Sequence, residues 1–350
     1  MVTEITDQSQ YESIWAREEL PFLQSWQWGE VKRGSSDIVR LLIEGVVTTV
    51  FVKKLGFLPW RFGYIPRPFS DTTLTADRLS QLKNYLHQNL QLTHILIDPN
   101  AQVGSPLGLS PYEAAGFSSS WHTVQPNQTN VIDLGSDESE LFARMTSTYR
   151  KKIRRAQKHG CTTEVVNAND PAVIDRFYPI VDSIYRRTDY VMFGRKYYER
   201  IWNEFRVSGR AVIVFVKYQG RDIGALFYVN SVDTASELYG GVVAEGLPLQ
   251  ANYLLKWAGI QHAKALGLRR YDMWGVGPMV DGVYLPNDPL YNISLFKKDF
   301  GGTYVQYLPQ QKLVFERFPH LFYQLGIWGH GGLVNAKKVL RRFKSRRVGK

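Results

Sequence analysis

Residues Ala211–Val229, AVIVFVKYQGRDIGALFYV, are the segment most informative about the fold. Two runs of β-branched, aromatic and other apolar residues flank Gln219-Gly220, and such a pair between strand-like runs indicates a tight hairpin turn. We therefore predict two antiparallel strands here. The elements expected after this hairpin are a strand ASELYGGV at Ala235–Val242, a helix LQANYLLKWAGIQHAKAL at Leu249–Leu266 and a strand RRYDMWG at Arg269–Gly275.

The first half of the chain repeats the same order of elements. Val39–Lys53 reads as a hairpin around Glu44-Gly45, Thr75–Leu90 has helical periodicity, and His94–Asp98 is a further strand. A meander of strands followed by a helix and another strand is typical of N-acetyltransferase-like (GNAT) folds. The fold class predicted is therefore α/β, with two tandem GNAT-like units whose mixed sheets are flanked by helices.

The join between the units is expected to be helical. Ser136 is a suitable N-cap for SDESELFARM, and the basic stretch TYRKKIRRAQKHG stops at Gly160. We assign residues 1–135 and 306–350 to the first unit and residues 136–305 to the second. From Asn335 the composition changes to a basic C-terminal tail, NAKKVLRRFKSRRVGK.

Composition limits the class of protein and its partners. The 350 residues are 44% hydrophobic, which is enough for a substantial core, and the formal net charge is +11. This charge favours an anionic partner, such as nucleic acid, a nucleotide diphosphate or a membrane, although a basic balance that only aids solubility is the alternative. Cys161 is the only cysteine, so an internal disulfide is excluded and a reducing compartment is expected.

The sequence also lacks the signals of export and membrane insertion. The start, MVTEITDQSQYESIW, is polar and acidic, unlike a signal peptide, and no apolar run approaches the length of a membrane span. We expect a cytoplasmic protein with at most peripheral membrane contact.

Self-contained catalytic motifs are missing from the sequence. The 7 histidines form no HExxH pair, one cysteine cannot build a multi-cysteine zinc site, and neither a Walker loop nor a GxSxG elbow occurs. We therefore predict no metal and no cofactor. The turn Leu247–Asn252 contains Pro248 and no glycine pair, which disfavours binding of an acyl-CoA pyrophosphate there.

A series of motifs in fixed order resembles the Fem family, the non-ribosomal peptidyl transferases that build peptidoglycan cross-bridges from aminoacyl-tRNA. The resemblance covers nearly the whole chain, and it rests on the order and spacing of the motifs rather than on any one of them. The motifs are FLQSWQWGEVKRG (22–34), GYIPRPF (63–69), ILIDP (95–99), VQPNQTNVIDL (124–134), MTSTYRKKIRRAQKHG (145–160), GALFYV (224–229), ELYGG (237–241), HAKALG (262–267), YDMWGV (271–276) and LFKKDFGGTYVQY (295–307).

The resemblance implies an aminoacyltransferase. It would move an aminoacyl group from aminoacyl-tRNA to an amine of a peptidoglycan precursor, either lipid-linked (lipid II) or nucleotide-linked (UDP-MurNAc-pentapeptide). The long helical arm of larger members is missing from the sequence, because Arg195–Gly209 leads directly into AVIVFV. Two rival functions stay open, an acyl-CoA-dependent GNAT acyltransferase and a non-catalytic RNA- or membrane-binding protein.

Matches to the family's acceptor site imply a set of substrate-binding residues. Lys32 of the W-G-x-x-K motif and Arg195 would hold the phosphates of the acceptor. Tyr198 and Tyr239 would be their neighbours in the acceptor groove, although FGRKYYERI departs from the family spacing by one residue, so Tyr197 is an alternative to Tyr198. The sequence alone would make Lys32 a solvated lysine on a helix.

The catalytic residue implied by the resemblance is Lys297, in Phe296–Phe300. A cation there would stabilise the oxyanion that forms when an amine attacks the ester carbonyl of aminoacyl-tRNA. Lys297 could equally satisfy the end of a helix that stops at Gly301-Gly302, and both roles can hold together. Asp98 is a tempting general base, but we expect it to organise the end of its strand and the acceptor, so the base is left open.

Two basic stretches complete the candidates. Lys151, Arg154 and Arg155 would wrap around a helix and meet tRNA phosphates nonspecifically, or would only be solvated. In the tail, apolar and basic residues alternate in a way that suits an amphipathic helix on an anionic membrane. These residues are Leu333, Val334, Val339, Leu340 and Phe343, and Lys337, Lys338, Arg341, Arg342 and Arg346.

Overall fold

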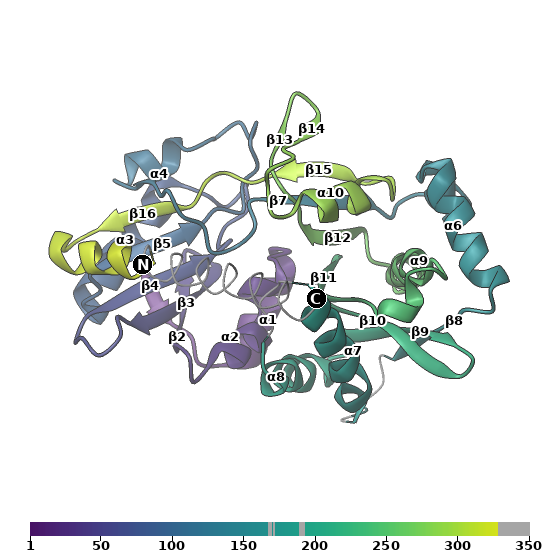
Figure 1. Ribbon diagram of the computed structural model, residues 1–350. Helices are drawn as coiled ribbons and strands as arrows, with labels where there is room; N and C mark the ends of the chain where they lie inside the picture. Colours follow the sequence, from purple (N-terminus) through teal and green to yellow (C-terminus); the bar gives the residue numbers. More distant parts are fainter. Residues whose placement is uncertain (167–169, 171, 189–192, 328–350) are drawn as a thin grey trace, which may run out of the picture.

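A computed structural model describes residues 1–166, 170, 172–188 and 193–327. Within these ranges the chain forms two seven-stranded sheets that lie side by side, the first at the left of Figure 1 and the second at the right. The first sheet has the order β1 (Val2–Glu4), β2 (Asp37–Ile43), β3 (Val46–Lys54), β4 (Arg61–Pro66), β5 (His94–Asp98), β16 (Gln311–Val314) and β6 (Ser118–Ser119). The second has the order β15 (Thr303–Gln306), β7 (Gln128–Asp133), β12 (Arg270–Gly275), β11 (Thr234–Val242), β10 (Arg221–Asn230), β9 (Ala211–Tyr218) and β8 (Thr162–Val166). A small hairpin of β13 (Met279–Val280) and β14 (Val283–Tyr284) stands apart from both sheets.

The two hairpin turns predicted from the sequence are present and alike. Glu44 and Gly45 have φ of 49° and 82°, and Gln219 and Gly220 have φ of 49° and 76°. Two consecutive positive φ angles match the right-handed twist of the flanking strands, and glycine at the second position adopts such an angle without strain. The prediction of antiparallel β2–β3 and β9–β10 is confirmed.

Each sheet also contains one pair of parallel strands joined by a helix. In the first, α3 (Ala76–Leu90) connects β4 to β5, and the Thr75 side chain caps its first turn. In the second, α9 (Ala251–Ala265) connects β11 to β12. The predicted fold class of two tandem GNAT-like units with mixed sheets is confirmed.

The join between the units consists of two helices, α5 (Glu138–Arg144) and α6 (Ser147–Lys158). The prediction of Ser136 as N-cap is wrong, because the side chain of Asp137 accepts the capping hydrogen bond from the Glu140 amide at 2.8 Å. Gly160 has a φ of 84° just after α6, as expected for a helix stop.

Sheet membership differs slightly from the proposed division at residues 135 and 305. β7 precedes residue 136 but pairs with β12 and β15, and β15 ends at Gln306. The proposed division is therefore close to, but not the same as, the division between the sheets.

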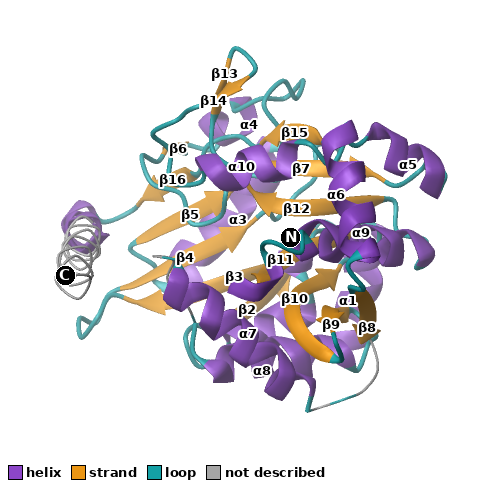
Figure 2. Ribbon diagram, turned by 45° about the vertical axis from the view of Figure 1, so that its right-hand side comes forward, coloured by secondary structure: helices purple, strands orange, loops and turns teal. Residues whose placement is uncertain are grey.

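One apolar core is shared between the two sheets. It contains Phe51 and Leu96 of the first sheet, Phe215 and Phe227 of the second, and Trp28 of α2 (Trp26–Lys32). The helices α7 (Val173–Arg187) and α8 (Arg195–Arg206) line this core, whereas α6 and α9 cover the opposite face of the second sheet (Figure 2). Because the core is continuous, residues from both units are held in fixed positions where they meet.

The remaining helices are α1 (Gln8–Arg17), η1 (Phe22–Gln24), α4 (Ser110–Ala114), η2 (Ala244–Gly246) and α10 (Tyr291–Lys298). All three residues of η1 are buried, and Phe22 and Leu23 belong to the shared core. Among the described residues, no helix combines the length and the apolar character needed to cross a bilayer.

Candidate functional site between the units

Lys32, the last residue of α2, places its ammonium group between aromatic rings. Its Nζ lies 4.4 Å from the ring centroid of Trp28 and 4.7 Å from that of Tyr197, and it donates a hydrogen bond of 2.9 Å to the Tyr197 hydroxyl. Within the described ranges, no carboxylate forms an ion pair with Lys32. Burial, followed by the nearby charge of Lys53, lowers the pKa of Lys32 to about 8. A half-buried cation without a carboxylate partner can accept an anionic ligand.

The tyrosine at Lys32 is Tyr197, and Tyr198 lies behind it in the core. Tyr239 donates a hydrogen bond of 3.3 Å from its hydroxyl to the Tyr197 hydroxyl, so Lys32, Tyr197 and Tyr239 form a chain. Tyr198 is fully buried, and its ring centroid is 5.0 Å from that of Tyr239. Tyr197, which the sequence offered as the alternative to Tyr198, is thus the tyrosine that contacts Lys32.

Lys53, near the end of β3, is a second cation of this region that the sequence analysis missed. Its Nζ lies 5.8 Å from the ring centroid of Tyr64, and burial lowers its pKa. Strand alternation could have found it, because Phe51, two residues earlier, faces the shared core and residues i and i+2 lie on one face. Lys54 also ends this strand and is exposed, so the sequence offers two lysines of which only one points inward.

Asp98 ends β5 in a closed set of hydrogen bonds. Its carboxylate accepts from the Tyr64 hydroxyl, from the Gln125 amide at 3.2 Å and from the Gln310 side chain at 2.7 Å. The carboxylate is buried, and burial raises its pKa in spite of these donors. The arrangement ties three separate segments together, which agrees with the expectation that Asp98 organises the end of its strand.

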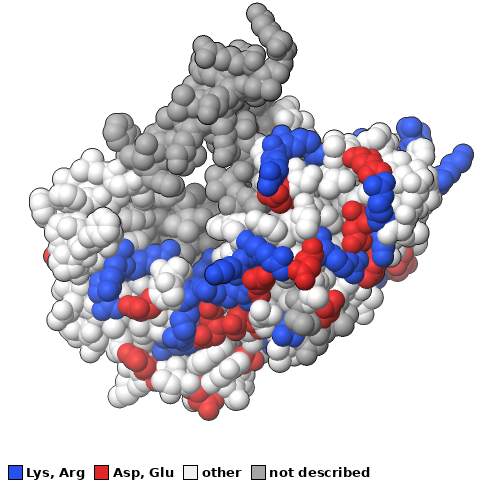
Figure 3. Space-filling view, turned by 60° about the horizontal axis from the view of Figure 1, so that its bottom comes forward, with Lys and Arg blue, Asp and Glu red and all other residues white. Residues whose placement is uncertain are grey.

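Arg195, the first residue of α8, does not lie with Lys32. Its guanidinium pairs with Asp175 of α7 and, at 2.6 Å, with Glu199, and nearly half of its side chain is exposed. These two carboxylates raise its pKa. Figure 3, which brings the lower side of Figure 1 forward, shows Lys and Arg interleaved with Asp and Glu on this face. Arg195 therefore belongs to a surface of paired charges.

Lys297 of α10 is buried, and backbone carbonyls hold its ammonium group. Its Nζ donates to the Trp274 oxygen at 3.1 Å and to the Gly275 oxygen at 3.0 Å. An ammonium has three N–H donors, so one is left for another acceptor. Burial lowers the pKa of Lys297 to about 8, which leaves it mostly charged near neutral pH. The role of Lys297 as an oxyanion partner, which the family resemblance implies, stays a prediction.

A bulge in β12 brings those two carbonyls to Lys297. The register between β12 and β7 shifts between Asp272 and Gly275, and Trp274 has a φ of 64°. A positive φ is costly for a tryptophan, and such strain tends to persist only where the surroundings enforce it. Here the Asp272 carboxylate accepts from the Trp274 amide at 2.7 Å, which supports the bulge.

A buried charged network lies beside Lys297 in the second unit, and no sequence motif indicates it. Lys256 of α9 pairs with Glu237 of β11, which also accepts a hydrogen bond of 3.1 Å from the Tyr271 hydroxyl. Glu237 and Asp272 favour the charged form of Lys297, whereas Lys256 opposes it. The network therefore sets part of the electrostatic environment of Lys297.

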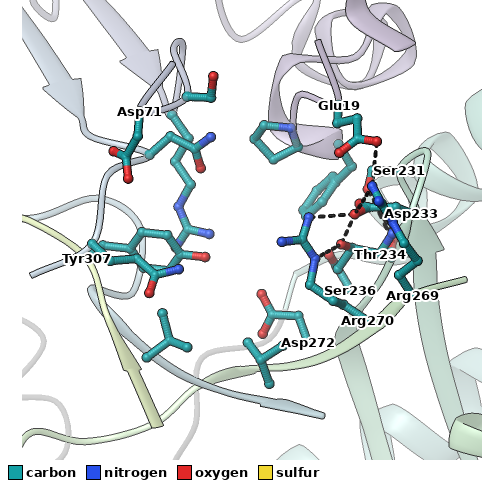
Figure 4. A pocket seen from close by; sticks show the side chains of 18 of the residues that line it. Glu19, Asp71, Ser231, Asp233, Thr234, Ser236, Arg269, Arg270, Asp272 and Tyr307 are labelled. Carbon is teal, nitrogen blue, oxygen red and sulfur yellow. Dashed lines mark hydrogen bonds and ion pairs between the residues drawn. The ribbon is translucent and has the colours of Figure 1, made fainter. Parts of the chain in front are cut away.

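A cavity of about 780 Å³ opens between the units, and Trp274 is one of the residues that line it. Figure 4 shows Asp71 and Tyr307 on one wall and Arg269, Arg270 and Asp233 joined by ion pairs on the other. The cavity has the size of a small-molecule site.

A buried arginine lines this cavity. Arg67 is only 4% exposed; its guanidinium lies 3.6 Å from the ring centroid of Tyr307 and donates a hydrogen bond of 3.1 Å to the Pro126 oxygen. Neither Lys32, Arg195 nor Lys297 lines the cavity. Arg67 and Asp272 mark it as a polar site; both lie in the quoted motifs GYIPRPF and YDMWGV, but neither was named as a site residue.

A chain of packed aromatic rings connects Lys32 to Lys297. The Lys32 ammonium lies over the ring of Trp28. The ring centroids of Trp28 and Phe22 are 5.1 Å apart, and those of Phe22 and Trp274 are 5.4 Å apart. The backbone oxygen of Trp274 then binds Lys297. Lys32, with Tyr197 and Tyr239, is thus linked to Lys297 through packed rings, whereas Arg195 pairs with Asp175 and Glu199.

The basic residues of α6 lie on the outer surface of the second unit. Lys151, Arg154 and Arg155 are exposed, and the Arg154 guanidinium packs 5.3 Å from the ring centroid of Phe142. The tail that begins at Asn335 lies outside the described residues. Over the part of the chain that is described, no group of three or more His, Cys, Asp or Glu residues is arranged to hold a metal ion.

Known proteins match the chain in sequence. Residues 143–281 match a family model described as an acetyltransferase (GNAT) domain. A lipid II:glycine glycyltransferase of Staphylococcus saprophyticus subsp. saprophyticus is 25% identical over 237 residues, which cover 63% of this chain and 56% of that protein. The chain thus spans little more than half the length of this relative.

Solved structures match the chain in fold. The crystal structure of FemX matches with a TM-score of 0.81, covering 93% of this chain and 99% of that chain at 18% identity. A tandem GNAT protein from the clavulanic acid biosynthesis pathway matches with a TM-score of 0.50, covering 90% of this chain and 98% of that chain at 10% identity. The chain thus contains a match to a GNAT domain, is similar in sequence to lipid II:glycine glycyltransferases over part of its length, and shares the fold of FemX, in agreement with the resemblance carried by the ordered motifs.

Proposed function

We propose that this protein is an aminoacyltransferase of peptidoglycan bridge synthesis, which transfers an aminoacyl group from aminoacyl-tRNA to an amine of a lipid- or UDP-linked muropeptide. The observation that carries the proposal is the geometry of Lys297, whose ammonium donates to two carbonyls and, among the described residues, has no third acceptor. Relatives named lipid II:glycine glycyltransferase support this reaction class. The tRNA donor follows from the Fem resemblance.

The proposed reaction needs no cofactor. The acceptor amine attacks the ester carbonyl, negative charge develops on the carbonyl oxygen, and the free donor of Lys297 stabilises that charge. An amide bond forms as the ester C–O bond breaks, and the leaving ribose oxygen takes up the proton that the amine loses. Positioning of the two substrates supplies the rest of the catalysis, because an ester is already a reactive acyl donor.

The proposed acceptor site is built around Lys32. Lys32 and Lys53 lack carboxylate partners among the described residues and would bind the phosphates of the acceptor, with Tyr197 and Tyr239 beside them. Arg195 would join them only by leaving Asp175 and Glu199. Tyr198 and Asp98 would support this site from behind.

We place the donor on the second unit and the reaction in the cytoplasm, where charged tRNA is found. Lys151, Arg154 and Arg155 of α6 are exposed and would meet tRNA phosphates. The basic tail from Asn335 would hold the enzyme at the inner face of an anionic membrane.

The test of this function is transfer of label from charged tRNA to a muropeptide acceptor. We expect acceptor-dependent transfer by the unaltered protein and, for Lys32→Met, a KM for the acceptor that rises roughly 10- to 100-fold, as for loss of a charge-assisted hydrogen bond. Lys54→Met, which changes the exposed neighbour of Lys53, is the control and should leave KM unchanged. No transfer with any charged tRNA would rule the function out.

The GNAT match favours one alternative, an acyl-CoA-dependent acyltransferase. The turn before α9 speaks against it, because Pro248 offers no N–H and Gln250, at the N-cap, has a φ of 60° and no side-chain capping bond. A rise in melting temperature with acetyl-CoA would favour the alternative.

A further inference from the structure

The helical residues 317–327, which follow β16, expose an apolar stripe. Phe318, Leu321, Phe322 and Leu325 are 62%, 49%, 42% and 54% exposed. Their spacing is i, i+3, i+4 and i+7, which places them on one face of the helix. In a globular protein such a face normally turns toward the core, whereas here a large part of each of these four side chains stays exposed.

The opposite face of the same helix is already packed. Tyr323 lies 4.9 Å from Phe62 and 4.7 Å from His94, and His320 lies 4.7 Å from His94, between ring centroids. These contacts fix the rotation of the helix about its axis. The apolar stripe therefore faces outward because the inward positions are taken by other side chains.

The turn between β3 and β4 extends this apolar stripe. Trp60 packs against Phe318 and Phe322 with ring centroids 5.7 Å and 5.4 Å apart. Phe57, at the tip of the turn, is fully exposed, and Leu58 is 38% exposed. In Figure 2 this turn and the helix that follows β16 project from the same side of the molecule. We call these seven residues the apolar face, namely Phe57, Leu58, Trp60, Phe318, Leu321, Phe322 and Leu325.

Charge indicates the kind of partner that the apolar face meets. Residues 328–350, which follow directly in the sequence, contain eight Lys and Arg residues and no Asp or Glu, so they hold most of the net charge of +11. Lys54 and Arg317, next to the apolar face in sequence, are exposed as well. A second copy of the chain would bring together two molecules that each carry a net charge of +11, which is electrostatically unfavourable. An anionic bilayer offers both an apolar interior and negative headgroups.

We propose that the apolar face docks on an anionic lipid bilayer, with Phe57 and the stripe of residues 317–327 entering the interface and Lys54 and Arg317 at the headgroups. The proposal rests on the proposed function only in its purpose, since it would bring the enzyme to a lipid-linked acceptor. Binding to the bilayer itself needs neither tRNA nor muropeptide.

The experiment is co-sedimentation of the full chain with vesicles of phosphatidylcholine alone or mixed with phosphatidylglycerol. We expect binding to the anionic vesicles, weaker binding at high salt, and a loss of affinity of roughly tenfold for each aromatic removed in Phe57→Ser and Phe322→Ser, as for loss of buried apolar area. Trp121→Ser is the matched control, because Trp121 is 62% exposed and lies outside the apolar face. It should bind like the unaltered protein.

Three results would overturn the docking proposal. They are absence of binding to anionic vesicles, equal binding by the Phe57→Ser and Phe322→Ser variants, and self-association that these variants abolish without any vesicle binding. Failure of the proposed function is separate, because it would leave vesicle binding intact while transfer to a water-soluble UDP-linked acceptor is missing. If the docking proposal and the proposed function are both correct, Phe57→Ser and Phe322→Ser should keep full activity on the soluble UDP-linked acceptor. They should lose activity on an acceptor embedded in vesicles.

Discussion

Lys297 shows how a buried residue can combine a structural and a chemical role. The sequence offered two interpretations, a helix-end lysine and an oxyanion partner, and the structure is compatible with both. The side chain lies in the last turn of α10, and two carbonyls of the β12 bulge fix its ammonium. A fixed cation needs little rearrangement as charge develops in a transition state.

Replacement of Lys297 by Met tests its proposed role. We expect kcat to fall by about 10²- to 10³-fold, as for loss of one oxyanion donor, with little change in KM for the acceptor. Lys298→Met is the matched control, because Lys298 is the exposed neighbour on the same helix. Steady-state kinetics with charged tRNA would measure both variants, and an equal loss in the two would remove Lys297 from the chemistry.

The lowered pKa of Lys297 predicts how kcat depends on pH. Its folded-state pKa of about 8 lies below the usual lysine value of 10.5, so the charged form is lost as pH rises through about 8. We expect kcat to decline on the alkaline side with an apparent pKa of about 8. A pH profile of kcat in which Lys297→Met keeps the same alkaline limb would contradict this assignment.

The lowered pKa of Lys297 also determines whether the free energy of unfolding rises or falls with pH. Between pH 8 and 10.5 the unfolded chain binds more protons at this lysine than the folded chain, so its contribution to the free energy of unfolding rises with pH in that window. The pKa of Lys32 is also about 8, so its contribution to the free energy of unfolding likewise rises with pH in this window.

The ion pairs of Arg195 predict how substitutions there change KM for the acceptor. If it binds acceptor phosphate, it must first leave Asp175 and Glu199. Asp175→Asn should then lower KM for the acceptor, or leave it unchanged, whereas Arg195→Met should raise it. Acceptor titrations would decide, and an Arg195→Met variant with unaltered KM would place Arg195 outside the acceptor site.

At the scale of elements, local patterns in the sequence predicted the fold well. The two hairpins with their turn pairs, the helices α3 and α9 and the strands β5 and β12 occur where periodicity placed them. Such elements depend on neighbours in the chain, which a sequence displays directly. The choice of Asp137 over Ser136 as N-cap was missed because both residue types cap well and adjacent positions compete.

Features that depend on contacts between distant elements could not be predicted. The bulge that turns two carbonyls toward Lys297 and the pair of Lys256 with Glu237 join β12 to α10 and α9 to β11. No short motif encodes these contacts, because each partner comes from a separate part of the chain.

The Lys256–Glu237 pair predicts a large effect on stability. Lys256→Met leaves a buried Glu237 without its cation and should lower the free energy of unfolding by about 3–5 kcal/mol. The double variant with Glu237→Leu should recover part of this loss. The control Arg221→Met, which breaks the exposed pair with Glu245, should cost less than about 1 kcal/mol. Urea unfolding would measure all three, and a small effect of Lys256→Met would show that the pair is not needed.

At the scale of the whole molecule, the shared core makes the two units act as one. Lys32 reaches Tyr197 of the second unit, and Phe22 of the first packs on Trp274, which carries a carbonyl that binds Lys297. The sequence named Lys32, Tyr239 and Lys297 through the family resemblance. It did not place Arg195 among the paired charges of the α7–α8 surface or reveal the cavity lined by Arg67, since both depend on how the units pack.

The most direct test of the account is the mass of a defined muropeptide acceptor after incubation with the protein and a full set of charged tRNAs. We expect a gain equal to one amino-acid residue, dependent on charged tRNA and strongly reduced in Lys297→Met. An acceptor of unchanged mass with every charged tRNA, or a gain of an acetyl group from acetyl-CoA instead, would contradict it.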